Sequence, residues 1–490
     1  MGPCTDPWVA SLTSKLGRSV AAAVPLLTEG DLSADDAVRQ LLELTHARRH
    51  LDLSDLSPQE QAAMIASTAE ALQPSEEAMA QRIAAAAAAR RPFVAKLGID
   101  PTGAEIHIGH AVPMITLSRL QRMGHRIVLI VGDMTAKIGD PSGRSDERPH
   151  LGDDEIAANL ATYKEQVAPF FDFSHAELRH NSDWLGAVTL PRLIEVTSRI
   201  PVSMSLQRED FRSRLAAGHS LTLAELLYSV AMALDSVQVN CDVEIGGIDQ
   251  YLNMQMCRKV MEICALEPEL VVANPLIEGT DGTGAKMSKS RNNYVALTAP
   301  PGEVFGKLMS VPDRLMGPYL RALSEWQPAE LAAVAARQAA GTLHPMDLKK
   351  VMAGEVTACL HGVDAAMVAR AEFVAQFSKS SYSSLTDLPE VPARWLDAAG
   401  AAAAPGTVAD ALKALGFAAS NGEVRRVAEQ KGLRLVLEKV GTPDGGPQEE
   451  AVLSVDEIRT PLGALLDAKF GAAPGECFLK FGRKLARVAR

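Results

Sequence analysis

The sequence has few cysteines, no excess of positive charge and no long apolar run. Its six cysteines show no Cys-x-x-Cys spacing, so the pattern indicates neither a disulfide framework nor a zinc site, and we expect a reducing, cytoplasmic location. No apolar run approaches the roughly 18 residues that would span a bilayer. We therefore expect neither a disulfide-rich secreted protein nor a membrane protein.

The formal net charge is −11 at neutral pH. A protein that coats nucleic acid without sequence preference needs a broadly basic surface, so the net charge argues against this mode of binding and leaves a local basic patch open. The chain has 490 residues, of which 47% are hydrophobic and 22% charged. Such a length and composition predict a folded protein of about two to four domains.

Composition and patterning divide the chain into four segments. Residues 1–92 are rich in Ala, Leu, Glu and Gln at helical spacing, and we interpret them as an N-terminal helical extension whose first 55 or so residues are partly ordered and carry no chemistry. Residues 93–315 alternate strands with helices, and residues 316–398 return to helical patterning. Residues 406–490 form a last module after an alanine-rich linker that contains a proline.

Short apolar strands alternate with amphipathic helices after residue 93. The run Arg126–Val131 has the composition of a buried strand, and Ala111–Met123 has the spacing of an amphipathic helix. This alternation predicts a parallel α/β sheet. Because ligands of such sheets bind at the carboxyl ends of the strands, we expect the functional motifs there.

A pair of histidines follows the first predicted strand of this sheet. His107 and His110 are three residues apart at the start of a helix, so their side chains share a face with the positive end of the helix dipole. Imidazoles in this place can donate hydrogen bonds to phosphate oxygens. Gly109 leaves room for an adenine or a ribose against the backbone. Two surface histidines or a metal-binding pair are the alternatives.

A glycine-rich loop with two lysines lies far downstream. It runs from Asp281 to Ser290 and includes the sequence Lys-Met-Ser-Lys-Ser that begins at Lys286. The lysines are spaced to reach successive phosphates, and the preceding glycines allow the loop to close on ATP. A solvated basic loop is the alternative.

One predicted helix carries an aspartate on an apolar face. Tyr228, Met232 and Asp235 stand at positions i, i+4 and i+7, so they line one side of this helix. A carboxylate among apolar neighbours is energetically costly, which favours a functional role. A surface carboxylate, or one paired within the fold, remains the alternative for Asp235.

The motifs His-Ile-Gly-His and Lys-Met-Ser-Lys-Ser resemble the paired signatures of class I aminoacyl-tRNA synthetases. The stretches Val131–Gly143 and Asp242–Gln250 are similar to two further blocks of tyrosyl-tRNA synthetases, and the chain resembles the bacterial subgroup whose first motif strand reads Lys-Leu-Gly. This resemblance implies a Rossmann-like catalytic domain over residues 93–315, an α-helical anticodon-binding domain over residues 316–398, and a C-terminal S4-like α+β domain.

The resemblance also assigns roles to individual residues. Those that would act on ATP are Thr102, His107, His110, Lys286 and Lys289 as catalytic groups, with Asp100, Gly109, Gly247, Asp249 and Ser288 as further contacts. Those that would bind the amino acid are Lys96, Asp140, Tyr228, Met232, Asp235 and Gln250. In the family, Asp235 corresponds to the residue that receives the tyrosine hydroxyl.

The same resemblance implies the small molecules and partners. ATP with Mg²⁺ would be a substrate, with no tightly bound cofactor and no metal held by the protein itself. L-tyrosine or a related amino acid and tRNA would be the other substrates. A homodimer is expected.

Two positions depart from the family pattern. Met232 stands where a glutamine is usual, and Ile248 replaces a small hydroxyl residue. These departures leave open a synthetase-like paralogue that adenylates tyrosine or a related amino acid and passes it to an acceptor other than tRNA. A non-enzymatic RNA-binding regulator is the third alternative, but every ATP-facing position carries the expected chemistry.

The last module carries a basic helix. A helix over residues 408–415 precedes Ser420-Asn-Gly-Glu423, which predicts a capping box opening the next helix. The basic residues expected to contact RNA are Arg425, Arg426 and Lys431. Residues 478–487 resemble the last strand of an S4 domain, and charges that merely make a small domain soluble are the alternative interpretation of this module.

Overall fold

The computed structural model describes most of the chain. The described residues are 13–142, 152–288, 291–377, 388–391, 406–438, 448–471, 475–482 and 484–488. They form two compact units, residues 1–367 and residues 368–490. Within the described residues, no helix is both long and apolar enough to cross a membrane.

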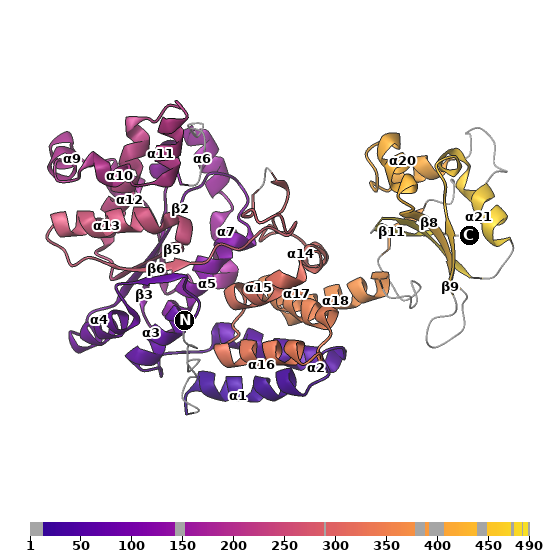
Figure 1. Cartoon of the computed structure of the whole chain (residues 1–490), viewed down its shortest axis with the longest axis horizontal. Coiled ribbons are helices and arrows are strands. Elements are labelled where there is room, and N and C mark those ends of the chain that lie inside the picture. Colours follow the sequence, from indigo (N-terminus) through magenta and orange to yellow (C-terminus); the bar gives the residue numbers. More distant parts are fainter. Residues whose placement is uncertain are drawn as a thin grey trace. The chain divides into compact units, whose positions relative to one another are not determined.

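A six-stranded sheet forms the centre of the first unit (Figure 1). Its strands lie in the order β1-β6-β5-β2-β3-β4. The bounds are β1 Ala71–Gln73, β2 Val94–Ile99, β3 Arg126–Val131, β4 Ala176–His180, β5 Val243–Gly247 and β6 Leu270–Asn274. All neighbouring pairs are parallel except β1 with β6. The parallel α/β sheet and the strand Arg126–Val131 are thus confirmed.

Two connecting helices show where the strand order of this sheet reverses. Helix α5 (Ile108–Arg122) leads from β2 to β3, and α13 (Tyr251–Ile263) leads from β5 to β6 in the opposite direction across the sheet. Because such crossovers are right-handed, the two helices cover opposite faces, as Figure 1 shows. The strand order reverses between β2 and β5, and open α/β sheets bind their ligands at such a point.

The other helices between β3 and β5 connect these strands. They are α6 Asp153–Leu160, α7 Tyr163–Val167, α8 Ser182–Leu185, α9 Leu190–Thr197, α10 Val202–Ser205, α11 Glu209–Ala216 and α12 Leu223–Val239. Thr222 caps the start of helix α12 and forms a capping box with Glu225, and Asn240 caps its end in the left-handed region with φ 47°. It packs beside α13 through an apolar cluster that includes Val230 and Ala233.

The N-terminal residues differ from the prediction. Helices α1 (Lys15–Thr28) and α2 (Asp35–Ala47) pack against the later helices α16 (Pro328–Ala339) and α17 (Pro345–His361). An apolar stripe on α1 is fully buried there. The interpretation of the first 55 or so residues as partly ordered is therefore wrong for residues 13–55. Their helical spacing was visible, but the surface that covers it comes from residues about 300 positions away.

The segment before residue 93 also contributes to the main sheet. Two short helices, α3 (Pro58–Ala66) and α4 (Glu76–Ala88), flank strand β1. Strand β1 pairs antiparallel with β6, with Ala71 opposite Ala273. The predicted N-terminal helical extension is thus mostly helical, but part of it belongs to the six-stranded sheet.

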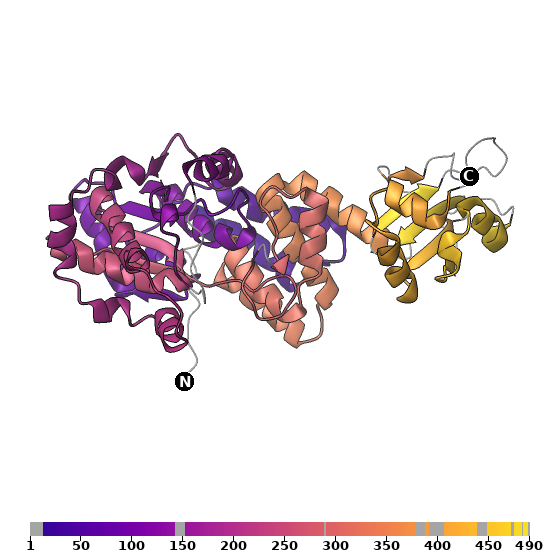
Figure 2. The ribbon, with the colours of Figure 1, turned by 90° about the horizontal axis from the view of Figure 1, so that it is seen from above.

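The helical region after the sheet is built around large buried side chains. Its helices are α14 Pro301–Met309, α15 Met316–Leu323, α16, α17 and α18 Val363–Phe377. Tyr319 and Trp326 are almost fully buried within this region. Figure 2 shows α14 to α17 gathered beside the sheet-bearing part of the same unit.

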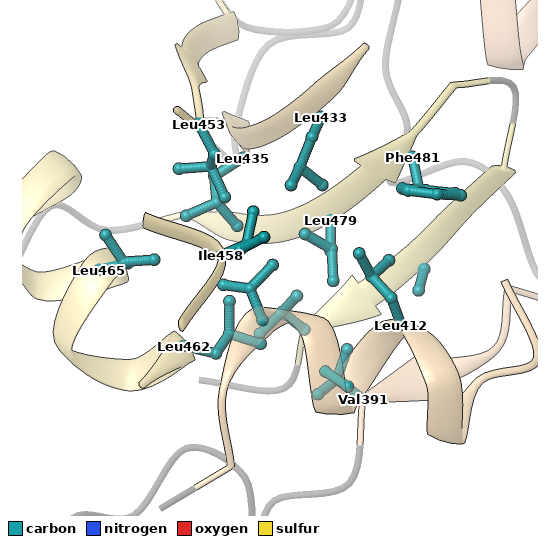
Figure 3. Packing of buried hydrophobic residues seen from close by; sticks show 14 of the residues in the cluster. Val391, Leu412, Leu433, Leu435, Leu453, Ile458, Leu462, Leu465, Leu479 and Phe481 are labelled. Carbon is teal, nitrogen blue, oxygen red and sulfur yellow. The ribbon is translucent and has the colours of Figure 1, made fainter. Parts of the chain in front are cut away.

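The second unit contains a five-stranded sheet in the order β7-β11-β10-β8-β9. The bounds are β7 Glu390–Val391, β8 Leu433–Glu438, β9 Gln448–Val452, β10 Glu476–Phe481 and β11 Lys484–Val488, with helices α19 Val408–Ala414, α20 Asn421–Glu429 and α21 Leu462–Phe470. Figure 3 shows the core of this unit, where Leu412, Leu435 and Leu479 meet between the helices and the sheet.

Two local predictions for this unit need correction. The expected last strand over residues 478–487 is a hairpin of β10 and β11, with Gly482 between them at φ 58°. Ser420 does cap α20, since its side chain accepts a hydrogen bond from the Glu423 amide. The Glu423 carboxylate, however, accepts from the Ala419 amide and does not complete the predicted capping box.

Candidate active site

A cavity of about 280 Å³ opens at the carboxyl ends of β2, β3, β5 and β6. It lies where the strand order reverses between β2 and β5. The predicted residues that line it are Asp100, Thr102, His107, Gly109, His110, Asp140, Tyr228, Met232, Asp235, Gly247, Asp249, Gln250 and Lys286. The structure therefore brings most of the predicted site into one cavity.

The histidine pair forms one wall at the start of α5. The Nδ1 atom of His107 accepts a hydrogen bond from the Gly109 amide at 3.2 Å, and Nδ1 of His110 accepts from the His107 amide at 3.3 Å. An imidazole whose Nδ1 accepts a hydrogen bond carries its proton on Nε2. The two rings lie 3.9 Å apart between centroids. The pair is thus held in the state that offers Nε2–H donors.

Gly109 has a local role in addition to the one predicted. A Cβ atom at this position would lie 2.9 Å from the His107 ring, which is too close for a real contact. The glycine therefore makes room for the imidazole itself. The same Cβ position would be 3.8 Å from the sulfur of Met287, so the lysine loop reaches the start of α5.

The lysine loop closes over the same cavity. Lys286 donates to a carboxylate oxygen of Asp249 at 3.1 Å, and both side chains are partly exposed. After the loop, the Ile108 amide donates to the carbonyl oxygen of Val295 at 2.9 Å, which holds the returning chain beside the histidine motif. Two motifs about 180 positions apart in the sequence thus meet at one cavity.

Asp235 lies at the floor of the cavity and is only 5% exposed. Its carboxylate accepts one hydrogen bond from the Trp184 indole at 2.8 Å and one from the side-chain amide of Asn181 at 3.2 Å. Burial raises the pKa of Asp235 to about 6, although the nearby Lys96 charge and the two donors act in the opposite direction. The group is therefore a desolvated acceptor with a fixed orientation.

Asp100 and Tyr228 form a second polar pair in the cavity. The Tyr228 hydroxyl donates to Oδ2 of Asp100 at 2.9 Å, and the Thr135 hydroxyl donates to Oδ1 of the same carboxylate at 2.7 Å. Asn181 also donates to Thr135 at 3.1 Å. One hydrogen-bond network therefore connects the end of β2 with Asp235 through Asn181.

Asp140 and Gln250 form a third polar pair. The Gln250 side chain donates to Oδ2 of Asp140 at 2.8 Å, and the Ser142 amide donates to Oδ1 at 2.9 Å. Gln250 ends a short 3-10 helix that follows β5. A carboxylate oriented in this way can receive a small cation such as an ammonium group.

Lys96 does not line the cavity, contrary to its predicted role in binding the amino acid. It is 1% exposed, and its ammonium group lies 2.9 Å from Glu244 and 2.5 Å from the Ser236 hydroxyl. Burial alone would lower the pKa of Lys96, but the negative charges of Glu244 and Glu269 outweigh it and raise the pKa well above its ordinary value. The strand alternation places Lys96 on the face turned to α12.

The remaining predicted residues lie elsewhere. The Ser288 amide donates to the Asn293 side chain at 2.9 Å, and Ser288 is absent from the cavity lining. Lys289 lies outside the described residues. Arg425, Arg426 and Lys431 are exposed in the second unit, on or directly after α20.

The residues that hold Asp235 were not among the predicted site residues. Asn181 and Trp184 directly follow β4, so they occupy the carboxyl end of a parallel strand. That position was the available signal, but β4 has no run of apolar residues and none of its positions is fully buried. Glu244 on β5 also lines the cavity and was not predicted.

A buried acidic cluster lies beneath the cavity. Potential ligand atoms of Glu244, Cys257 and Glu269 all lie within 4.8 Å of one another. The ammonium group of Lys96 already supplies positive charge to this cluster, at 2.9 Å from Glu244. The cluster is therefore accounted for by an ion pair within the protein core.

Residues 88–378 match the family described as tRNA synthetases class I (W and Y), which is more than half of the chain. The chain belongs to this family of class I tRNA synthetases. The histidine pair and the lysine loop of this synthetase both fall within the matched range.

Several similar curated proteins are named tyrosine–tRNA ligase. A tyrosine–tRNA ligase from Thermotoga maritima is 37% identical over 345 residues, covering 70% of this chain and 83% of the relative. A tyrosine–tRNA ligase from Moorella thermoacetica is 36% identical over 373 residues, covering 75% of this chain and 87% of the relative. This synthetase therefore spans most of the length of these relatives.

Solved structures show the same fold at lower identity. A truncated mitochondrial tyrosyl-tRNA synthetase from Aspergillus nidulans matches with a TM-score of 0.54 and 16% identity, covering 70% of this chain and 99% of that one. The tyrosyl-tRNA synthetase from Archaeoglobus fulgidus, solved with L-tyrosine, matches with a TM-score of 0.52 and 22% identity. The match covers 63% of this chain and 99% of that one. The Rossmann-like fold of the catalytic part is thus confirmed.

Proposed function

We propose that this class I synthetase is a tyrosine–tRNA ligase. It would activate L-tyrosine with ATP to tyrosyl-adenylate and pyrophosphate, and then transfer the tyrosyl group to the 3′ end of tRNA. The single observation that carries the proposal is one cavity that joins the histidine pair and Lys286 to a floor bearing Asp235. The names of the curated relatives support the same amino acid.

The ATP end of the cavity would lie between α5 and the lysine loop. His107 and His110 would donate from Nε2 to phosphate oxygens, and Lys286 would exchange its contact with Asp249 for a phosphate. Lys289 would act with Lys286 on the pyrophosphate leaving group. Asp249, released from the lysine, would then be able to bind a ribose hydroxyl.

The amino-acid end would lie over Asp235. The desolvated carboxylate of Asp235 would accept the hydrogen bond of the tyrosine hydroxyl, since its own two donors fix its direction. Asp140, Gln250 and Tyr228 would bind the ammonium group. Met232 also lines the cavity and would contribute an apolar contact to the amino acid.

The chemistry requires positioning more than proton transfer. The amino-acid carboxylate is ionised at neutral pH, so it can attack the α-phosphate of ATP without a general base. Catalysis then comes from holding the reacting groups in line and from stabilising negative charge on the phosphates. In the second step, a ribose hydroxyl of tRNA attacks the acyl carbon and AMP leaves.

Mg²⁺ would enter as part of the ATP substrate. Mg²⁺ prefers several oxygen ligands in octahedral geometry. In the described part of the chain, the cluster of Glu244, Cys257 and Glu269 includes a thiol and is neutralised by Lys96, so it does not fit this ion. The phosphates of ATP would therefore be its main ligands.

Two further features support the expected partners. Arg425, Arg426 and Lys431 present exposed positive charge on the second unit, which suits the phosphates of tRNA. Leu190 and Ile194 lie one turn apart on α9 and are 67% and 55% exposed. Such an exposed apolar pair is consistent with a homodimer in which α9 lies at the interface.

The test is amino-acid-dependent exchange of pyrophosphate into ATP with each of the twenty amino acids, followed by tRNA charging. We expect exchange with tyrosine alone and charging of tRNA that reads tyrosine codons. Exchange with tyrosine but no charging would favour a paralogue with another acceptor. No exchange with any amino acid would contradict an enzymatic function.

A further inference from the structure

Arg208 lies behind the cavity and belongs to none of the predicted motifs. It precedes α11, is 7% exposed, and does not line the cavity. Its guanidinium donates to Oδ1 of Asn253 at 2.6 Å, to the Ser142 hydroxyl at 2.8 Å and to the Asp210 carboxylate at 2.9 and 3.2 Å. It also lies 4.9 Å from the centre of the Phe211 ring. A buried side chain with this many fixed contacts has one orientation.

The guanidinium of Arg208 determines which group donates and which accepts in the hydrogen bonds that lead from it to Asp140. Arginine has donors and no acceptor, so Asn253 must turn its oxygen toward Arg208. The Asn253 nitrogen then faces Gln250 and donates to its Oε1 at 2.8 Å. Gln250 in turn directs its nitrogen to Asp140 at 2.8 Å. Three successive hydrogen bonds therefore run one way, from Arg208 to Asp140.

This direction matters because an isolated side-chain amide can rotate by 180° at little cost. A reversed Gln250 would place its carbonyl oxygen against the Asp140 carboxylate, and two acceptors at hydrogen-bond distance repel each other. The pair would then separate, and the carboxylate would lose its orientation. With Arg208 in place, the side-chain amides of Asn253 and Gln250 each keep one orientation.

We propose that Arg208 is a positioning residue that acts through Asn253 to fix the amide of Gln250 and, with it, the carboxylate of Asp140 that receives the substrate ammonium group. This inference rests on the proposed amino-acid site. It goes beyond that site because Arg208 and Asn253 line no part of the cavity. Both are buried, and Asn253 is fully so.

Asn253→Asp is the sharpest test because it keeps the shape of the side chain. One aspartate oxygen still accepts from Arg208, but the other now faces Gln250 and forces its amide to reverse. We expect the KM for tyrosine to rise at least about tenfold. Simple electrostatics predicts the opposite, since an added negative charge nearby would strengthen the binding of an ammonium group.

The affinity for desaminotyrosine, 3-(4-hydroxyphenyl)propionate, separates positioning from a general structural role. This analogue lacks the ammonium group, so its inhibition constant should change less than twofold in Asn253→Asp. The matched control is Asn240→Asp, which adds the same charge at the exposed end of α12 and should leave both constants unchanged. Equal weakening of tyrosine and desaminotyrosine, or unchanged binding of tyrosine, would overturn the proposal.

A second pair of variants covers the case in which Asn253→Asp does not fold. Arg208→Lys keeps a group with donors only and should leave the KM for tyrosine within about threefold of the wild type. Arg208→Gln can present an acceptor to Asn253 and should raise this KM about tenfold, with kcat changed less. Equal effects of the two variants would overturn the proposal. Lack of tyrosine-dependent exchange in the wild type would instead refute the proposed function.

Discussion

In the proposed function, the single buried side chain of Asp235 sets the choice of amino acid. Its carboxylate is desolvated, and its two donors, Asn181 and Trp184, leave it oriented toward the cavity. A substrate hydroxyl that reaches it gains a hydrogen bond to a charged group. A substrate without the hydroxyl must leave the buried carboxylate without that partner, which costs free energy.

Replacing Asp235 should therefore remove most of the preference for tyrosine over phenylalanine. A hydrogen bond to a charged group contributes about 1.5–3 kcal/mol, so we expect kcat/KM for tyrosine to fall about 10- to 150-fold in Asp235→Ala. The value for phenylalanine should fall less or rise. The measurement is pyrophosphate exchange with both amino acids. An unchanged ratio would remove Asp235 from the pocket.

Among the individual site residues, those that belong to motifs could be predicted from the sequence. The residues that hold them in place could not. His107, His110 and Asp235 could be predicted because helical spacing places them on defined faces. Asn181 could not, because its contacts with Asp235 join the end of β4 to the middle of α12, and no local pattern records that distance. The position of Lys96 could not be predicted either, because its burial depends on contacts with Ser236 on α12 and Glu244 on β5, which are far away in the sequence.

The N-terminal helices are joined to the helical region by a buried ion pair. Arg48, directly after α2, makes two hydrogen bonds of 2.7 Å to the carboxylate of Glu330 on α16, and both side chains are at most 1% exposed. The carboxylate also accepts from the Gln327 amide at 2.7 Å. Removing one charge of such a pair leaves the other buried without a partner.

Arg48→Met should therefore destabilise the first unit by about 3–5 kcal/mol. The double variant Arg48→Met/Glu330→Met should recover most of that loss, because it removes both charges. Arg39→Met is the control, since Arg39 pairs at 2.7 Å with the highly exposed Asp364 and its loss should change stability little. Urea denaturation measures all three. A double variant as unstable as Arg48→Met would contradict this assignment.

The same junction contains a carboxyl group that is sensitive to pH. Glu355 on α17 accepts hydrogen bonds from Trp326 at 2.7 Å and from Thr45 at 2.8 Å through one oxygen. Burial raises the pKa of Glu355 to about 7 despite these donors and the nearby arginines. A raised pKa means that the protonated form stabilises the fold, and that this contribution is lost as the pH rises through about 7.

Glu355→Gln keeps the accepting oxygen and removes the titration. Relative to wild type, the variant should therefore gain about 2–3 kcal/mol in unfolding free energy between pH 5 and pH 8.5. Urea denaturation of both proteins at the two pH values provides the comparison. Parallel pH dependences would show that folding does not raise the pKa of Glu355.

At the scale of elements, helices and strands with strong local patterns were predicted well. The run Arg126–Val131 and the helix that starts at Val408 lie where their residues indicated. The partners of α1 and α2, and the addition of β1 to the sheet, could not be predicted, because each depends on residues that are far away in the sequence. The hairpin of β10 and β11 was missed because its turn at Gly482 was interpreted as part of one strand.

At the scale of the whole molecule, the two units divide the work in the proposed function. The first unit contains the cavity, and the second unit presents exposed arginines on α20. Charge-neutralising contacts with phosphates make binding dependent on salt. The second unit should therefore affect the affinity for tRNA and not the activation of the amino acid.

The double variant Arg425→Ala/Arg426→Ala tests this division. We expect weaker tRNA binding, and a slope of log affinity against log salt that is smaller by about one for each phosphate that the variant no longer neutralises. Pyrophosphate exchange should be unchanged. Lys469→Ala is the control, since it removes a positive charge from α21 of the same unit and leaves α20 unchanged. An unchanged salt slope would argue against RNA binding by this helix.

The most direct test is the pre-steady-state rate of adenylate formation in Lys286→Ala, with Lys259→Ala on α13 as the surface control. Convergence of the lysine loop and the histidine pair on one ATP predicts a rate that falls by a factor on the order of 10², while the Kd for tyrosine stays the same. An unchanged rate, or an equal loss in tyrosine affinity, would contradict a shared nucleotide site.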